Sequence, residues 1–143
     1  MTKITSEPLD PARIMNEVST PESGGVAIFV GVVRNKSQGK MVHHLEYASY
    51  VPMGEKLMAE IEREMKQKWG VHRVVLVHRI GLLQIGEVAV VAAVSAEHRK
   101  EAFESCQYAI ERIKSIVPIW KKESFGTDEA WSVGNTPADR VVR

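Results

Sequence analysis

One apolar stripe constrains the fold of this chain more than any other feature of its sequence. Between Ser95 and Pro118, apolar residues recur at the three- and four-residue spacing of an α-helix. The face that they form contains Ala102, Cys106, Ala109, Ile113 and Ile116, flanked by Phe103, Ile110 and Val117. Ser95 is suited to cap the start of this helix, and Pro118 is suited to stop it. The spacing therefore predicts a long amphipathic helix packed on a core, followed by a strand over residues 119–125.

Among the side chains in and beside this helix that carry a positive charge or a proton, five are candidate site residues. They are His98, Arg99, Lys114, Lys121 and Lys122. The whole chain has a formal net charge of only +1, so no general excess of cations explains the cluster. Burying ammonium and guanidinium groups beside apolar surface is costly unless an anion or a reacting group meets them. The segment therefore indicates a site for a small, negatively charged substrate.

The composition narrows the class of protein. The chain is 44% hydrophobic and 26% charged, which predicts one globular domain over residues 1–143, with a mobile tail over 134–143 where apolar residues are sparse. Its 19 basic and 18 acidic residues give no footprint for binding nucleic acid or an anionic membrane surface. No apolar run reaches the length of a membrane span. We expect a cytoplasmic protein.

No metal site and no cofactor are predicted. The single cysteine, Cys106, lies in the apolar stripe and is expected to be a core residue rather than a nucleophile. The other histidines show neither the spacing of a metal site nor accompanying carboxylates, so we expect strand and loop residues at His43, His44, His72 and His78.

The rest of the sequence interleaves helices and strands without a regular βαβ repeat. Asp10 and Pro11 begin a short helix, and Pro52 begins a longer one that ends at Gly70. The core-facing stripe of the longer helix is Met53, Leu57, Ile61 and Met65. Strands are expected over residues 26–33, 42–50, 74–80 and 88–94, the first being an interior strand paired with the second as a hairpin. The predicted class is α+β, a mixed, mainly antiparallel sheet packed by helices.

The start of the long helix and the end of the first strand are candidate anion sites. His98 and Arg99 are expected in the first helical turn, where they would cover the edge of the core or bind an anion. The free N–H groups and the positive end of the helix dipole favour the anion. Arg34 ends the first strand and leads into a basic loop. Sheets usually present catalytic groups at such strand ends, but the tip of a surface hairpin would also be basic and polar.

The end of the long helix brings three lysines near one another in the sequence. Lys114 in the last turn complements the negative end of the helix dipole, and Lys121 and Lys122 taken alone are a solvated pair. Alternation along a strand turns one of that pair inward. A turn at Pro118 would fold Lys121 back beside Lys114. Two ammonium groups held together make one amine available as a base or a nucleophile.

These segments resemble the large, catalytic subunit of molybdopterin synthase. The resemblance covers most of the chain, and its last two blocks are the most specific. The matching segments are Phe29 to Arg34, Leu45-Glu46-Tyr47 with Tyr50 and Met53, His78 to Gly81, His98 to Phe103, Arg112-Ile113-Lys114 and Pro118 to Glu123. The sequence departs from the family pattern at Ala48, at Glu111 and after Phe125, and none of these departures removes a cation.

The resemblance implies an α/β hammerhead-type fold and a homodimer of large subunits, each carrying a small ubiquitin-like subunit, in a heterotetramer. The Gly-Gly tail of the small subunit, a thiocarboxylate, would enter a pocket of this chain. It would transfer sulfur twice to cyclic pyranopterin monophosphate (precursor Z), giving the dithiolene of molybdopterin in molybdenum cofactor biosynthesis. Neither transfer needs a metal. By the resemblance Lys114 and Lys121 are catalytic, and the substrate-binding residues are Val32, Val33, Arg34, His98, Arg99, Lys114, Lys121, Lys122 and Glu123.

Two other functions would use the same residues. The paired lysines would serve a Schiff-base enzyme that acts on a phosphorylated carbonyl compound. The pocket alone would serve a non-catalytic module that holds the carboxylate tail of a partner.

The length of the long helix predicts how the site is assembled. Arg99 and Lys114 are 15 residues apart, or roughly 22 Å at 1.5 Å per residue. A pterin phosphate cannot bridge that distance. We therefore predict a two-fold dimer with two composite pockets, each taking His98 and Arg99 from one subunit and Arg34, Lys114 and Lys121 from the other.

Overall fold

The computed structural model describes residues 1–125 and 128–132, so the tail expected over 134–143 lies outside the described residues. The helices are α1 (Pro11–Val18), α2 (Val51–Trp69) and α3 (Arg99–Ile116). The strands are β1 (Thr2–Thr5), β2 (Gly25–Val32), β3 (Lys36–Ser37), β4 (Lys40–Met41), β5 (His44–Ser49), β6 (Val74–Arg79), β7 (Gly81–Gln84), β8 (Val88–Ala96), β9 (Ile119–Phe125) and β10 (Asp128–Ser132). None of these helices is long and apolar enough to cross a membrane.

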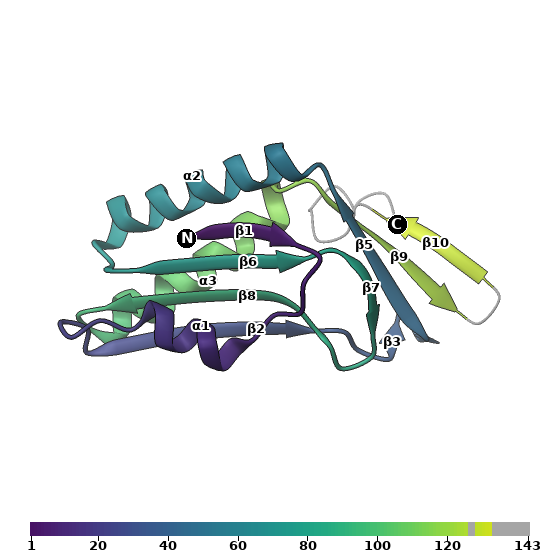
Figure 1. Ribbon diagram of the computed structural model, residues 1–143, viewed down its shortest axis with the longest axis horizontal. Coiled ribbons are helices and arrows are strands. Elements are labelled where there is room, and N and C mark those ends of the chain that lie inside the picture. Colours follow the sequence, from purple (N-terminus) through teal and green to yellow (C-terminus); the bar gives the residue numbers. More distant parts are fainter. Residues whose placement is uncertain (126–127, 133–143) are drawn as a thin grey trace.

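The strands form two four-stranded sheets and one small ribbon. The first sheet has the order β1-β6-β8-β2, with β1 parallel to β6 and the other neighbours antiparallel. The second sheet, β10-β9-β5-β7, is wholly antiparallel, and β3 pairs with β4. The second sheet lies beyond the end of the first where β6 leads into β7 (Figure 1). The predicted α+β class, with a mixed, mainly antiparallel sheet packed by helices, is confirmed.

Helices cover both faces of the first sheet, which explains the continuous apolar runs in β6 and β8. Successive side chains of a strand point to opposite faces. In β6, Val74 and Leu76 belong to the large core packed by α2 and α3, whereas Val75 and Val77 belong to a smaller core packed by α1. A strand covered on both sides needs apolar residues at every position, because neither face meets water.

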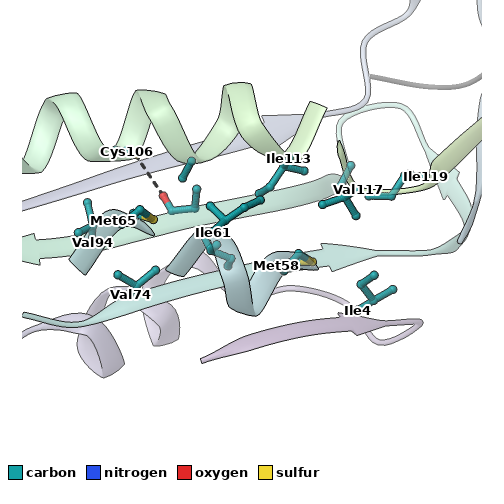
Figure 2. Close-up of a cluster of buried hydrophobic side chains, with 14 of the residues drawn as sticks. Ile4, Met58, Ile61, Met65, Val74, Val94, Cys106, Ile113, Val117 and Ile119 are labelled. Carbon is teal, nitrogen blue, oxygen red and sulfur yellow. Dashed lines mark hydrogen bonds between the residues drawn. The ribbon is translucent and has the colours of Figure 1, made fainter. Parts of the chain in front are cut away.

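The larger core joins the two long helices to the sheet. Figure 2 shows Met58, Ile61 and Met65 of α2 gathered with Ile113 of α3, and all four are at most 3% exposed. The same core continues past the end of α3 to Ile119 at the start of β9. The first and second sheets are therefore held by one continuous apolar cluster.

The helix boundaries follow the capping residues in the sequence. Asp10 accepts hydrogen bonds from the N–H groups of Ala12 and Arg13 at 3.1 and 3.3 Å, which satisfies two free donors of α1. Gly70 ends α2 in the left-handed conformation, at φ 62°, and its N–H donates to the carbonyl of Lys66. Both boundaries are confirmed.

The predicted start of α3 is wrong by three residues. Ser95 does not cap the helix, because β8 continues to Ala96 while pairing with β2. The Ser95 hydroxyl instead accepts a hydrogen bond from the N–H of Arg73 at 3.1 Å. His98 is the N-cap residue, and its side chain makes no capping hydrogen bond.

The predicted hairpin between the first two long strands is also wrong. β2 lies at the edge of the first sheet and pairs with β8, whereas β5 lies between β9 and β7 in the second sheet. The β3–β4 ribbon separates them and carries the chain from one sheet to the other. Because β2 is an edge strand and not an interior one, Phe29 and Val32 remain 37% and 56% exposed.

The core-facing stripe of α2 differs from the prediction in its first turn. Its buried residues are Gly54, Met58, Ile61 and Met65, whereas Met53 is 43% exposed. A Cβ on Gly54 would meet the Cδ1 atom of Ile4 at 2.5 Å, so the missing side chain allows the close approach of α2 to β1. The strands that the sequence did not predict are all five residues long or shorter, namely β1, β3, β4, β7 and β10.

Cys106 and His78 are among the ionisable side chains that lie buried in the described part of the chain. Burial raises the pKa of the Cys106 thiol to about 11, and the thiol donates to the carbonyl of Ala92 at 3.5 Å, drawn as the dashed line in Figure 2. Cys106 is therefore confirmed as a core residue. His78 is fully buried, and its burial lowers the imidazole pKa from 6.5 to about 4, partly opposed by a hydrogen bond to the carbonyl of Arg79.

We expect His78 to make the fold sensitive to mild acid. The unfolded chain protonates this imidazole near pH 6.5 and the folded chain only near pH 4, so the unfolded state binds more protons between those values and stability falls with falling pH. The loss from pH 7 to pH 5 is about 2 kcal/mol. Urea denaturation of the wild type and of His78→Gln at both pH values measures it. An equal loss in both proteins would contradict the assignment.

We expect Cys106 to react with a thiol reagent only after unfolding. Raising the pKa of the thiol from 9.0 to about 11 lowers the thiolate fraction at pH 8 about 100-fold, and burial blocks access as well. Labelling with a chromogenic disulfide in buffer and in 8 M urea, a concentration chosen as roughly enough to unfold a domain of this size, compares the two rates. Fast labelling of the native protein would show that the thiol is accessible.

Candidate functional site

One pocket collects several of the residues that the sequence singled out. It has a volume of about 440 Å³ and is lined by the end of β2, by the segment that follows it, and by parts of β5, β8, β9 and α3. Its charged lining residues are Arg34, Lys36, Lys114, Lys121 and Glu123. The pocket therefore lies where the two sheets meet the C-terminal end of α3.

A sharp corner between α3 and β9 forms one wall of the pocket. The N–H of Val117 donates to the carbonyl of Ile113 at 3.1 Å, which closes the last turn of the helix. The Ser49 hydroxyl on β5 donates to the carbonyl of Pro118 at 2.8 Å. Val117 and Ile119 on either side of the proline are 1% and 2% exposed. The corner is therefore fixed by core packing on both sides and by a hydrogen bond from the second sheet.

This corner brings Lys114 and Lys121 to the same pocket. Lys114 lies in the last turn of α3, and Lys121 is the third residue of β9. Alternation along β9 puts Glu123 on the same side as Lys121, and both line the pocket. Lys122, one residue between them, does not line it. Two ammonium groups and one buried carboxylate thus surround a single hollow.

The end of β2 contributes a further cation. Arg34 lies two residues after the end of β2, is exposed, and lines the pocket together with Val32. Val33 does not line it, because its side chain is 3% exposed and packs in the large core. Of these three neighbours, the structure therefore brings two to the pocket and leaves one in the core.

Tyr47 provides a neutral hydroxyl at the inner wall. Its side chain is 8% exposed and lines the pocket from β5. Burial, with a smaller contribution from the negative charge of Glu123, raises the pKa of the phenol to about 12. Tyr47 is therefore uncharged at neutral pH and can both donate and accept a hydrogen bond.

His98 and Arg99 do not reach this pocket within one chain. Both are exposed at the start of α3, and the His98 side chain is 71% exposed with its nearest carboxylate, that of Glu101, at 3.6 Å. Lys114 lies almost the whole length of the helix away, roughly 22 Å along its axis. The residues predicted to bind one anionic substrate thus form two separate groups in the subunit.

His78 lines the pocket, although the sequence did not single it out as a site residue. This residue was expected to be an ordinary strand residue, and it is the fifth residue of β6, on the same face as Val74 and Leu76. The signal in the sequence was the alternation of the strand, in which His78 falls on the same face as Val74 and Leu76, at a position where a core residue is expected.

Among the residues that the structure describes, no group of three or more histidine, cysteine, aspartate or glutamate side chains could hold a metal ion. The side chains that line the pocket have chemistry of their own. They offer several cationic hydrogen-bond donors for an anion, and amines and a carboxylate for moving protons.

Comparison with known proteins identifies relatives over most of the chain. The family model described as MoaE protein matches residues 4–116. The molybdopterin synthase catalytic subunit of Bacillus subtilis (strain 168) is 46% identical over 129 residues, which are 90% of this chain and 82% of the relative. The subunit of the same name from Halalkalibacterium halodurans is 44% identical over 128 residues, again 90% and 82% of the two chains.

Solved structures agree with the sequence comparison. A chain of molybdopterin synthase from Staphylococcus aureus superposes with a TM-score of 0.86 at 43% identity, covering 90% of this chain and 94% of that one. A chain from the complex of subunits 1 and 2 of molybdopterin-converting factor from Helicobacter pylori has a TM-score of 0.78 at 22% identity, a likeness of fold alone. By the extent and identity of these matches, the chain belongs to the MoaE protein family, the family of molybdopterin synthase catalytic subunits.

Proposed function

We propose that this chain transfers sulfur from a thiocarboxylated carrier protein to cyclic pyranopterin monophosphate, forming the dithiolene of molybdopterin. The observation that carries the proposal is the corner between α3 and β9, which brings Lys114 and Lys121 to one pocket with Arg34. The family assignment favours this reaction over the Schiff-base enzyme and the non-catalytic tail-binding module.

The proposed chemistry matches the charges of the pocket. The precursor carries a phosphate, which Arg34 and the lysines can bind with charge-assisted hydrogen bonds. In each transfer the carrier's sulfur forms a bond to a side-chain carbon of the precursor, and the oxygen on that carbon leaves after protonation. Hydrolysis of the acyl–sulfur bond then releases the carrier as a carboxylate. Lys114 and Lys121 can supply these protons and stabilise the negative charge that develops.

The carrier that we propose is a small ubiquitin-like subunit with a C-terminal Gly-Gly thiocarboxylate. A tail of two glycines is narrow enough to enter a pocket of about 440 Å³ that must also hold the precursor. The Helicobacter pylori chain of the same fold comes from a complex of two subunits. For this chain we propose a homodimer of large subunits with one carrier on each, a heterotetramer. The cytoplasmic location expected from the sequence stays a prediction.

We assign the individual roles as follows. Lys114 and Lys121 are catalytic, and they also bind the substrate. The other substrate-binding residues are Val32, Val33, Arg34, His98, Arg99, Lys122 and Glu123. Val33 lies in the core, so its contribution would come from its backbone or from holding its neighbours in place. Glu123 is 7% exposed, and its carboxylate can orient the ammonium groups around it.

His98 and Arg99 would enter the pocket from a second copy of the chain. Among the described residues β2 pairs only with β8, so its outer edge is open to another strand. Its Gly25 end adjoins the start of α3, since a Cβ on Gly25 would lie 3.4 Å from the Cα of Arg99. Its other end, at Val32, adjoins the pocket. An antiparallel pair of β2 strands would therefore bring the partner subunit's Arg99 to this end.

Apolar side chains beside the same edge support a second copy there. Phe29 on β2 and Phe103 on α3 are 37% and 68% exposed and line an open hollow of about 500 Å³. The span of β2, roughly 26 Å for eight residues at 3.3 Å each, is close to the distance between the two cationic groups along α3. A two-fold axis near the middle of β2 would thus exchange the two ends of the strand between subunits.

Replacing either pocket lysine by alanine should abolish most of the activity. We expect Lys114→Ala and Lys121→Ala to slow conversion of the precursor at least about 100-fold, the usual effect of losing a proton-transfer group. Lys56→Ala, an exposed position on α2 outside the pocket, is the matched control. Mass spectrometry of the pterin product measures the rate with thiocarboxylated carrier. Near-normal conversion by a folded Lys121→Ala protein would contradict the catalytic assignment.

Mixing two inactive variants should restore activity if the pocket is shared. We expect Arg99→Ala and Lys121→Ala homodimers to be inactive, and heterodimers formed by subunit exchange to regain activity, because one of their two pockets is wholly intact. Differently tagged chains allow the heterodimer to be purified before the assay. An inactive heterodimer, after exchange has been verified, would show that Arg99 and Lys121 do not act in one composite pocket.

A further inference from the structure

His78 is a buried polar side chain at the wall of the pocket with one ring nitrogen unpaired. The residue is fully buried, and its ring packs edge-on against Tyr47 with centroids 5.0 Å apart. Its Nδ1 atom lies 2.8 Å from the carbonyl oxygen of Arg79. Its Nε2 atom is buried and has no hydrogen-bond partner among the described residues. A buried polar atom without a partner in a folded protein calls for a physical explanation.

The contact with Arg79 fixes which nitrogen carries the proton. A carbonyl oxygen can only accept, so Nδ1 must be the donor in this hydrogen bond. In the neutral ring Nε2 then carries a lone pair and no proton. Burial supports the neutral ring, because it lowers the pKa of His78 to about 4. At neutral pH His78 therefore holds an uncharged, buried hydrogen-bond acceptor in the wall of the pocket.

The charged groups of the pocket are less suited to accept a hydrogen bond from a ligand. Arg34, Lys36, Lys114 and Lys121 only donate hydrogen bonds, and these cations compete with a ligand for the carboxylate oxygens of Glu123. A ligand held by those cations through its anionic end still has N–H groups that must be satisfied once water has been excluded.

We propose that His78 is a substrate-positioning residue whose Nε2 atom accepts a hydrogen bond from an N–H group of the ligand bound in the pocket. The inference rests on the proposed function and extends it, because it assigns to the pocket a neutral acceptor without a proton of its own, beside the Tyr47 hydroxyl and the charged groups. Two ligands of that reaction carry such N–H groups. One is the heterocycle of cyclic pyranopterin monophosphate, and the other is the C-terminal Gly-Gly backbone of the carrier.

A matched pair of substitutions separates hydrogen bonding from packing. In His78→Gln the side-chain oxygen can take the place of Nε2 as an acceptor, whereas His78→Met has a similar length and volume but no comparable acceptor. We expect His78→Met to weaken binding of one of the two ligands about tenfold and to raise KM more than it lowers kcat. His78→Gln should stay within about threefold of the wild type. Calorimetric titration of each full-length variant with the precursor alone, and with the carboxylate form of the carrier alone, measures the two affinities.

Each outcome of the titrations either supports or overturns the proposal. A loss for the precursor supports the pterin ring as the donor, and a loss for the carrier supports the glycine backbone. Unchanged affinities would overturn the proposal, because they would exclude a contact between His78 and either ligand. Equal losses in His78→Gln and His78→Met would also overturn it, because they would indicate an effect of packing alone.

A spectroscopic measurement on the wild type tests the same contact without any substitution. The ¹⁵N resonance of the His78 Nε2 atom should move upfield, as for a nitrogen that gains a hydrogen bond, when the precursor or the carrier is added. His72, whose Nδ1 atom already lies 2.6 Å from the Ser23 hydroxyl outside the pocket, is the internal control. No movement with either ligand in a protein that still transfers sulfur would overturn this inference alone. Loss of sulfur transfer in the wild type would instead contradict the proposed function.

Discussion

The site depends on the corner at Pro118, where the apolar stripe of α3 gives way to a strand of the second sheet. Val117 and Ile119 are buried on either side of it, and Ser49 of β5 holds the carbonyl of the proline. Because both flanking residues belong to the continuous core, the direction of β9 is set by packing and not by local turn preference alone. The corner therefore sets the positions of Lys114 and Lys121 and of the pocket wall to which both belong.

The first sheet supplies the rigid frame behind that wall. Its two central strands are covered by helices on both faces, so their apolar side chains exclude water from both sides. His78 near the end of β6 lines the pocket from this dry interior, and Arg34, two residues after the end of β2, lines it as an exposed residue. The same sheet thus places a neutral group at depth and a cation at the surface, which suits a ligand with an apolar ring and an anionic end.

Elements with strong periodicity or capping could be predicted from the sequence, and those fixed by distant pairing could not. Asp10 and Gly70 mark helix ends through local hydrogen bonds, and Pro118 stops α3 by removing a donor. These three helix ends were therefore predicted correctly. The partner of β2 is β8, whose paired residues lie 56 (Val32 with Val88) to 71 (Gly25 with Ala96) positions further along the chain, and nothing local specifies it. His78 was missed for the same reason, because only the meeting of two sheets turns a strand residue into part of a pocket.

A crystal structure of the chain with cyclic pyranopterin monophosphate bound would test the central claim most directly. The account predicts that the ligand lies between Lys114 and Lys121 with its phosphate about 3 Å from a cationic nitrogen, and that the partner subunit's Arg99 contacts the same ligand. A ligand bound away from the α3–β9 corner, or a complete pocket formed within one subunit, would contradict it.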